Sequence, residues 1–444
     1  MFDKSLTRRN FLATAVTGTA APAALKAQSR PVRLGLLGCG KITQRNVPLM
    51  KSRIEAGELK ITACCDLYGK RLREMAELTG AESTTDYKKV LQRNDVDFVY
   101  IGTPDHWHAP MILDSIAAGK DVLVEKPMTL NTDEARAVYK AVKQSGCIFS
   151  TGSRSLRHGA YWVARDIVKT GILGHLLWCQ TARTTNLPTS SAIVPSVVAS
   201  GGGDTAGPDG TGDNHIVWDA YHGKGPVRDW DPDRFFNWRR FKDYSIGTSG
   251  DLLWYNISDI LLAVGPLFPI RATGSGGTYL GETNELPNLF FSTIQYQNDF
   301  YIATMYSLLN DHGWSDIISG QEASLYFSGG HYGISGDGVI LAPDRRFEKG
   351  FRQKCERLGL TGTWQPFKRD QWLGPVRHSY EVEAMHFEGF KRPASTIDEF
   401  IDCVRDRRKM VMDETFSYKV MQSLAMGMEA LDNSQVEVFD SKSI

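Results

Sequence analysis

The sequence carries no excess of charge of either sign. Lys and Arg together number 51 in 444 residues, and Asp and Glu together also number 51, so the formal net charge at pH 7 is zero. Proteins that bind nucleic acids normally have a basic excess that attracts the phosphate backbone, so we expect no nucleic-acid partner. Hydrophobic residues make up 42% of the chain, which is ordinary for a soluble globular enzyme of about two or three domains.

Cysteines are few and scattered. Their number, seven, is odd, and they stand at Cys39, Cys64, Cys65, Cys147, Cys179, Cys355 and Cys403. This pattern gives neither a disulfide framework nor a Cys-rich metal site. It fits a protein that folds among reduced thiols.

Long apolar runs are also missing, and the one modest run lies in a targeting-like segment, residues 1–29. There, Thr7-Arg8-Arg9-Asn10-Phe11-Leu12 opens an apolar stretch that ends before Lys26, with small-residue cleavage sites around Ala23 and Ala27. The stretch is too short and polar for a stable membrane span. The order of its parts predicts export by the twin-arginine translocation machinery to the periplasm or beyond the cell. The alternative is a frayed N-terminus with a chance Arg-Arg pair.

The rest of the chain divides by its pattern of apolar residues. In residues 31–150, apolar runs at 32–37, 61–65, 98–101, 121–124 and 148–151 alternate with helical patterns such as 69–78 and 132–144. This alternation predicts an α/β domain with a parallel, doubly wound sheet. Residues 151–395 instead show strand-like alternation at 289–296, 300–307 and 323–327, which predicts a mixed or antiparallel sheet with one open face. Residues 396–444 return to a helical pattern and end in a polar tail.

A glycine-rich turn follows the first predicted strand. Gly38-Cys39-Gly40-Lys41-Ile42-Thr43 can bring backbone N–H groups close to a pyrophosphate at a helix N-terminus, so Gly38, Gly40, Lys41 and Ile42 are predicted to bind a dinucleotide. Thr43 departs from the usual third glycine. Asp66, at the end of the next strand, can bind ribose hydroxyls and favours NAD. Arg71 follows closely and could offset that charge, so NADP stays open.

A second turn, Gly102-Thr103-Pro104-Asp105-His106-Trp107-His108, follows the strand at 98–101. Ligands of open α/β sheets bind at this end of the strands, so Thr103 and Pro104 are predicted to shape a nicotinamide pocket. His106 and His108 are candidate cofactor-binding residues, with a structural role as the alternative. Their spacing could suggest a metal site, but no further acidic or histidine partner is near in sequence, and no metal is expected.

The third turn is Val124-Glu125-Lys126-Pro127. A lysine at a strand end beside a nicotinamide can polarise or deprotonate a substrate hydroxyl, and partial burial would lower its pKa toward the working range. Glu125 and Lys126 are therefore placed at the cofactor, with Lys126 as the catalytic candidate. Arg154, after the last strand of the domain, is a further candidate cofactor contact.

Together, the three turns resemble those of the glucose–fructose oxidoreductase, inositol dehydrogenase and rhizopine catabolism family (Gfo/Idh/MocA). The resemblance continues in Lys169-Thr170-Gly171-Ile172-Leu173-Gly174 and in Phe400-Ile401-Asp402-Cys403-Val404-Arg405. It implies an N-terminal Rossmann domain, a C-terminal open-faced β-sheet domain, and NAD or NADP as cofactor. It also implies a carbohydrate substrate, a homo-oligomer (dimer or tetramer) and Lys126 as the family's catalytic lysine.

One departure concerns the family's Asp and His pair, which stand four residues apart. The matching segment is 250–259. If Asp251 corresponds to the family's aspartate, Tyr255 stands at the histidine position. If Asp259 corresponds to the aspartate, Asn256 stands at the histidine position. Asp251 and Tyr255 are therefore predicted to act with Lys126, and Asn256 is a candidate for substrate binding.

Softer candidates for substrate binding precede this segment: Trp238, Arg239 and His222. Aromatic rings can stack on sugar faces, although such clusters are often only core. The sequence thus favours an exported sugar oxidoreductase with a tightly bound NAD(P) that is recycled on the protein. The alternatives are a redox-neutral glycosidase, lyase or epimerase, and a non-catalytic carbohydrate-binding protein.

Overall fold

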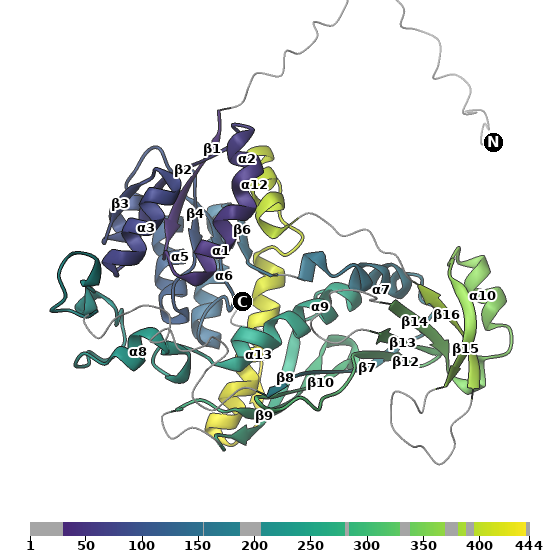
Figure 1. Cartoon of the computed structure of the whole chain (residues 1–444). Coiled ribbons are helices and arrows are strands. Elements are labelled where there is room, and N and C mark those ends of the chain that lie inside the picture. The colour runs from purple at the N-terminus through teal and green to yellow at the C-terminus, as the bar shows by residue number, and fades with distance from the viewer. Residues whose placement is uncertain are drawn as a thin grey trace, which may run out of the picture.

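The computed structural model describes residues 30–153, 155–186, 206–279, 284–328, 338–368, 381–387 and 395–440. The twin-arginine segment and Arg154 lie outside the described residues. The described chain forms a Rossmann domain beside a second domain built on one large sheet, and the long helix α13 runs between them (Figure 1). The predicted fold class is confirmed.

The Rossmann sheet has six parallel strands in the order β3-β2-β1-β4-β5-β6. Its strands are β1 Val32–Leu37, β2 Leu59–Cys65, β3 Glu82–Thr84, β4 Phe98–Ile101, β5 Asp121–Val124 and β6 Phe149–Thr151. The strand order reverses between β1 and β4, and ligands of such sheets bind outside the carboxyl ends at this switch point. All three predicted turns follow strands at this end of the sheet.

Helices cover both faces of this sheet, as the strand connections require. They are α1 Lys41–Asn46, α2 Lys51–Glu55, α3 Gly69–Thr79, α4 Tyr87–Leu91, α5 His108–Ala117 and α6 Thr132–Ser145. The local sequence sets the ends of α6. The Asn131 side chain accepts a hydrogen bond from the backbone N–H of Glu134, and Gly146 adopts the left-handed conformation (φ 67°) that closes a helix.

The second domain has a sheet in the order β15-β16-β14-β13-β12-β7-β10-β9-β8-β17, and β11 pairs with β7. The pair β7–β10 is parallel and the other pairs are antiparallel, so the sheet is mixed. Its strands are β7 Leu176–Asn186, β8 Pro269–Gly277, β9 Leu289–Tyr296, β10 Tyr301–Ser307, β11 Leu309–Asn310, β12 Ile317–Gly320, β13 Ala323–Ser328, β14 Gly338–Pro343, β15 Thr363–Lys368, β16 Glu381–Phe387 and β17 Glu437–Val438.

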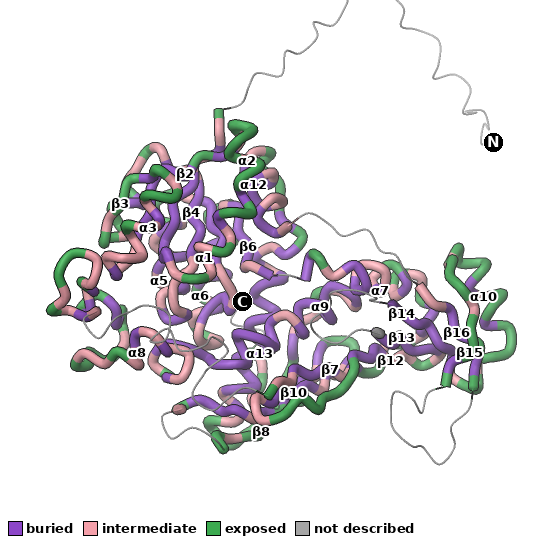
Figure 2. Tube along the Cα trace, viewed as in Figure 1, coloured by how far each residue is buried: buried purple, intermediate pink, exposed green. Residues whose placement is uncertain are grey.

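One face of this sheet is covered by helices, so its strands alternate between buried and exposed residues (Figure 2). In β9, Phe290 and Ile294 face the core, whereas Phe291 is 38% exposed on the other side. The domain's helices are α7 Gly159–Lys169, α8 Pro232–Phe236, α9 Trp254–Val264, α10 Phe351–Arg357, α12 Thr396–Asp406 and α13 Glu414–Asn433. None of the helices in the described part of the chain has the length and apolar character needed to cross a membrane.

The two C-terminal helices join the domains. Helix α13 lies against β8, where a Cβ on Gly274 would come within 2.1 Å of the Gly427 carbonyl oxygen. On its other side, Tyr418 stacks on Tyr139 of α6 with ring centroids 4.5 Å apart. Helix α12 packs on the Rossmann core, where the ring centroids of Phe400 and Phe98 lie 5.4 Å apart. The two domains therefore share one continuous hydrophobic core.

Residues 206–245, which we call the clasp, form an irregular segment of short helical turns with their own small aromatic core. The clasp is bonded to both domains. On the side of the second domain, the Glu285 N–H, between β8 and β9, donates to the Arg240 carbonyl at 2.9 Å. The Gly69 N–H donates to the carbonyl of His215, and the Val217 N–H donates to that of Leu67, each at 2.9 Å. The clasp thus lies against the loop that follows Asp66.

Candidate active site

A cavity of about 930 Å³ opens at the carboxyl ends of the Rossmann strands and extends under the clasp. It runs from the glycine-rich turn to the turn after β5. Fourteen of the predicted site residues line it, namely Gly38, Gly40, Lys41, Ile42, Asp66, Arg71, Thr103, Pro104, Glu125, Lys126, Trp238, Arg239, Asp251 and Tyr255. Folding therefore brings three turns of the first domain together with two segments of the second.

The glycine-rich turn has the geometry that a pyrophosphate needs. Gly38 has φ +90°, and a Cβ there would lie 2.8 Å from the Gly102 backbone, so no other residue fits without strain. Gly40 precedes α1 without a side-chain cap, and a Cβ there would meet nothing within 4 Å. Thr43 explains the missing third glycine, because its hydroxyl donates to the Gly38 carbonyl at 2.6 Å and holds the turn. The first N–H groups of α1 thus face open space.

Asp66 is fixed at the edge of the same space. Its carboxylate accepts hydrogen bonds from the backbone N–H groups of Cys39 at 2.7 Å and Tyr68 at 2.9 Å. The Arg71 guanidinium lies 5.4 Å from the ring centroids of Tyr68 and Phe235, as in cation–π contacts. A ribose could bind Asp66, as in NAD, and a 2′-phosphate could bind Arg71, as in NADP. This part of the cavity is therefore compatible with either nucleotide.

The same cavity offers further groups that could hold a nicotinamide ribose or amide. The Thr103 hydroxyl is buried and has no hydrogen-bond partner among the residues that the structure describes. Glu125 is held by Tyr100, whose hydroxyl donates to it at 2.7 Å, and by the Asn46 amide at 3.2 Å. Because an orphaned hydroxyl and an open glycine cradle line one cavity, the residues fit a dinucleotide.

Three charged side chains meet beside Glu125. The Lys126 ammonium donates to one oxygen of Asp251, and the Arg239 Nε lies 3.4 Å from the other. The Lys126 and Asp251 side chains are only 10% and 8% exposed. Together they form a buried cluster that we call the charge triad.

The triad fixes the protonation states of its members. Burial alone would lower the pKa of Lys126, but the Asp251 carboxylate raises it overall. For Asp251, burial acts to raise the pKa, and the charges of Lys126 and Arg239 outweigh it and hold the pKa at about 2. The sequence-based expectation of a lowered lysine pKa is therefore wrong, because it did not include a buried counter-charge. At neutral pH Lys126 is a cation and Asp251 an anion.

A local distortion of the backbone places Asp251. Residues Ser249–Leu253 form a π-helical turn that leads into α9, and such turns are frequent at functional sites. A Cβ on Gly250 would lie 2.8 Å from Pro127, so only glycine lets this turn approach the Lys126–Pro127 peptide, which is cis. Asp259, the other possible anchor, does not line the cavity, since its carboxylate lies 2.8 Å from the His158 Nδ1.

The register set by Asp251 places Tyr255 in the cavity. The centre of its ring is 5.9 Å from the Lys126 ammonium nitrogen. Asn256 points elsewhere, because its amide donates to the Thr181 hydroxyl at 2.6 Å in β7. The predicted substrate contact of Asn256 is thus replaced by a structural bond between α9 and the sheet.

Two of the predicted histidines lie behind the cavity wall and do not line the cavity. His108 is fully buried, with its ring nitrogens 2.6 Å from the Pro127 carbonyl oxygen and 3.0 Å from that of Thr103. A neutral ring has one N–H and donates to only one of these carbonyls, and the shorter contact links its turn to that of Pro127. His106 Nε2 lies 2.6 Å from the carbonyl oxygen of Tyr221 in the clasp. Burial lowers the pKa of both to about 4, which keeps the rings neutral. Their cofactor-binding role is corrected to the structural alternative.

His222 likewise packs within the clasp. Its ring meets that of Trp218 with centroids 4.4 Å apart, and the predicted substrate contact gives way to core packing. No group of three His, Cys, Asp or Glu side chains in the described ranges could hold a metal ion.

Residues 32–153 match the model of a family described as "Oxidoreductase family, NAD-binding Rossmann fold" (GFO_IDH_MocA). This domain of the chain belongs to the Gfo/Idh/MocA oxidoreductase family. The matched region carries all three turns that line the cavity.

Relatives match mainly over this same domain. The chain is 30% identical over 151 residues to a "dTDP-3,4-didehydro-2,6-dideoxy-alpha-D-glucose 3-reductase" of Actinomadura kijaniata, covering 34% of this chain and 45% of that protein. It is 30% identical over 165 residues to a "Glycosyl hydrolase family 109 protein" of Shewanella pealeana, covering 34% and 35%. The alignments thus span less than half the length of these relatives.

A solved structure extends the likeness to both domains. The WlbA dehydrogenase of Bordetella pertussis, in complex with NADH and UDP-GlcNAcA, aligns with a TM-score of 0.63 over 93% of this chain and 99% of that one. The two chains are 13% identical. This likeness shows that the two proteins share the same overall fold across both domains.

Some residues that line the cavity carried no signal in the sequence. Residues Ser395–Ile397, at the start of α12, and Arg157, just after β6, come from outside the three turns. The start of α12 is docked there by the Thr396 hydroxyl, which donates to the Ser153 carbonyl. This contact joins residues 243 positions apart, and no local pattern announces it.

Substitutions at the two glycines of the nucleotide turn should have contrasting effects. Gly40→Ala should leave the free energy of unfolding nearly unchanged, because its Cβ meets no atom and its φ of −69° suits any residue. It should nevertheless weaken dinucleotide binding about tenfold or more, since the methyl group enters the space of the pyrophosphate. Gly38→Ala is the matched control that should lose stability as well. Urea unfolding and calorimetric titration with NAD(H) measure the two effects, and equal nucleotide affinity in wild type and Gly40→Ala would contradict this placement.

Proposed function

We propose that this protein is an NAD(P)-dependent oxidoreductase that acts on a sugar or sugar derivative, exported with its cofactor tightly bound and recycled on the protein. The observation that carries the proposal is the charge triad at the end of a cavity whose other end is the nucleotide turn. A buried lysine beside a dinucleotide site is the arrangement that alcohol–carbonyl chemistry requires.

The chain's own residues divide the work of holding the cofactor. Gly38 and Gly40 would face the pyrophosphate, Asp66 the adenosine ribose, and Thr103 and Glu125 the nicotinamide half. When bound, the nicotinamide supplies the acceptor or donor of a hydride at a substrate carbon.

Lys126 would donate or accept the proton that accompanies hydride transfer. As a cation it can donate a proton to the carbonyl oxygen when a substrate is reduced, which leaves a neutral amine that can take the hydroxyl proton of the next substrate when that one is oxidised. Asp251 keeps the ammonium in place and charged, while Arg239 holds the other side of that carboxylate. Tyr255, beside Lys126, is placed where a phenol could pass a proton on.

The wall opposite the cofactor suits a carbohydrate. Trp238 lines the cavity, and its ring lies 4.1 Å from the Arg239 guanidinium, which gives an aromatic face next to a hydrogen-bond donor. A sugar reductase among the relatives and the UDP-GlcNAcA complex of WlbA support a substrate of this class. Which sugar binds is a question of pocket shape that a substrate panel can answer.

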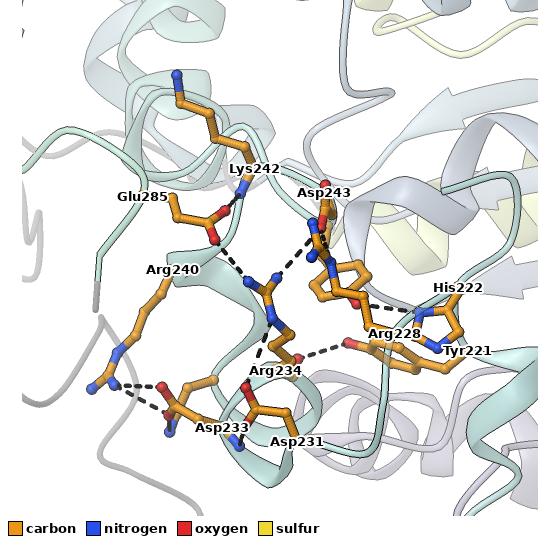
Figure 3. A network of polar contacts seen from close by, with 12 residues as sticks. Tyr221, His222, Arg228, Asp231, Asp233, Arg234, Arg240, Lys242, Asp243 and Glu285 are labelled. Carbon is orange, nitrogen blue, oxygen red and sulfur yellow. Dashed lines mark hydrogen bonds and ion pairs between the residues drawn. The ribbon is translucent and has the colours of Figure 1, made fainter. Parts of the chain in front are cut away.

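The clasp supports retention of the cofactor. Its Val217, Ala220 and Tyr221 line the cavity on the side of Leu67 and Arg71, so a nucleotide would lie partly beneath it. A network of ion pairs makes the clasp rigid (Figure 3). Arg234 is its centre, pairing with Asp243 at 3.3 Å and with Glu285 at 2.8 Å. Release of a nucleotide would require this braced segment to move away from the Rossmann domain, which favours slow exchange.

We also propose that the open face of the large sheet is covered in a homo-oligomer, a dimer or a tetramer. Trp178, Phe291 and Trp314 are 36–39% exposed on or beside this sheet, with Phe291 and Trp314 in ring contact at 6.4 Å. A cluster of large apolar side chains on one face is typical of subunit interfaces. Light scattering should give a mass of two or four chains, and Phe291→Glu should reduce it; a monomeric wild-type mass would contradict the proposal.

The functional proposal is tested on the purified protein with its bound nucleotide. Single sugars, sugar acids and pairs of them are added while the nicotinamide absorbance is followed. We expect one sugar to change the redox state of the bound cofactor and a second sugar to reverse it, with no added NAD(P). A cofactor whose redox state never changes across sugars and glycosides would contradict the proposal.

A second candidate function is a redox-neutral reaction, in which a sugar is oxidised transiently, a bond is cleaved or inverted, and the sugar is reduced again. The similarity to a glycosyl hydrolase family 109 protein favours it, although the sequence lacks the additional motifs expected of exported N-acetylgalactosaminidases. It is distinguished by its product, because it cleaves a glycoside without any net change in nicotinamide absorbance.

A further inference from the structure

Asp105 is a buried carboxyl group outside the cavity that a chain of hydrogen bonds connects to Asp251. It follows β4 and is only 3% exposed. The Ser245 hydroxyl donates to its Oδ2 at 2.8 Å and accepts from the Gly247 N–H at 2.9 Å. The Gly247 carbonyl in turn accepts from the Asp251 N–H at 3.0 Å. The turn that carries Asp251 is thereby fastened to the Rossmann domain at Asp105.

The groups that face Asp105 include the whole charge triad. Burial raises the pKa of Asp105. Arg239, the Ser245 hydroxyl and Lys126 lower this pKa, the Asp251 charge raises it further, and the resulting pKa is about 7. Its sequence neighbour His106 is neutral at this pH. Lys126 and Asp251 keep their charges near neutral pH, whereas Asp105 gains one there. Ionised Asp105 therefore adds a second negative charge opposite two cations.

We propose that Asp105 is a positioning residue of the charge triad, which holds Asp251 against Lys126 through the hydrogen bonds of Ser245 and Gly247. The inference rests on the proposed function for its catalytic consequence only. The contacts themselves are independent of any substrate.

Two variants separate the charge from the hydrogen bond. Asp105→Asn keeps an oxygen that can accept from Ser245 and removes the charge, whereas Ser245→Ala removes the hydroxyl and keeps the carboxyl group. A raised carboxyl pKa contributes stability fully below the unfolded value of about 4, and this contribution is lost as the pH rises through the folded value. An Asn side chain does not titrate, so Asp105→Asn does not lose stability in this way. Hence the melting temperature of Asp105→Asn, relative to wild type, should rise between about pH 4 and about pH 7.

The matched variant Ser245→Ala should show a difference from wild type that changes little over this pH range, because the carboxyl group still titrates. A pH-independent difference for Asp105→Asn would overturn the inference. Thermal unfolding needs no substrate, so this result can be read even if no redox reaction is found, and its failure is distinguishable from failure of the proposed function.

Activity provides the second readout. In the direction of carbonyl reduction, Lys126 donates its proton from the place where Asp251 holds it. Ser245→Ala loosens the turn that carries Asp251 and should lower kcat about tenfold with little change in KM, whereas Asp105→Asn keeps an acceptor for Ser245 and should lower kcat less. Equal kcat in wild type and Ser245→Ala would contradict the positioning role.

Discussion

Lys126→Met is expected to lower turnover with a sugar substrate by about 10²–10⁴-fold while leaving the nicotinamide nucleotide bound. The methionine fills a similar volume but cannot supply a proton to the substrate oxygen. Asp251 keeps Arg239 as a partner at 3.4 Å, so the buried carboxylate is not left alone and the fold should persist. Turnover is measured with the responsive sugar, and bound nucleotide by mass spectrometry after denaturation.

Two controls accompany this variant. Lys140→Met changes an exposed lysine on α6 and should leave turnover unchanged. Lys126→Arg keeps the charge beside Asp251 but holds its proton more firmly, so it should retain the fold and lose most of the activity. If Lys126→Met kept full activity, the proton would have to come from another group, and if no variant affected any assay, the non-catalytic carbohydrate-binding alternative would gain support.

Asp251→Asn is expected to lower the free energy of unfolding by about 3–5 kcal/mol, the range found when a buried ion pair loses one partner. The change leaves Lys126 and Arg239 side by side without the carboxylate between them. Removing the lysine as well should relieve this repulsion. The double variant Lys126→Met/Asp251→Asn should therefore be more stable than Asp251→Asn alone, which a cycle of urea unfolding experiments measures as a coupling energy.

The matched control for location is Asp259→Asn, eight residues along the same helical segment. It breaks a contact with His158 that faces away from the cavity, so it should lose stability without changing the redox behaviour of the bound cofactor. A double variant no more stable than Asp251→Asn would show that Lys126 and Asp251 do not depend on each other, against the structure of the triad.

The Rossmann half of the fold could be predicted because its information is local. Each of β1, β4 and β5 is a short apolar run next to a turn with a distinctive composition, and α3 and α6 differ from the predicted ranges by one residue at one end. Parallel strands bring their carboxyl ends to one edge, so the three turns could be assigned to one site before any contact was known.

Several strands of the second domain and the finer parts of the site could not be predicted in this way. Strand β14, for example, is buried along its whole length and shows no alternation. Periodicity along α9 does not reveal the π-helical turn that directs Asp251 into the cavity and Asn256 into the sheet. The contact between Arg239 and Asp251 depends on how the clasp docks, which is a tertiary property.

The same reason explains the error about Lys126. The sequence places a lysine at a strand end and suggests burial, which lowers a lysine pKa. The counter-charge that reverses the shift comes from a residue 125 positions away. Asp105 was overlooked for a related reason, because its partner Ser245 belongs to the clasp and only the folded chain shows that the two meet.

The central claim is that the cavity holds a nicotinamide dinucleotide beside the charge triad, and the most direct test is to denature the purified mature protein and identify what it releases by absorbance and mass spectrometry. We predict NAD(H) or NADP(H) in near-stoichiometric amount, retained through purification by the clasp. No released nucleotide, together with no binding when NAD(H) and NADP(H) are added, would contradict the claim and every catalytic role that rests on it.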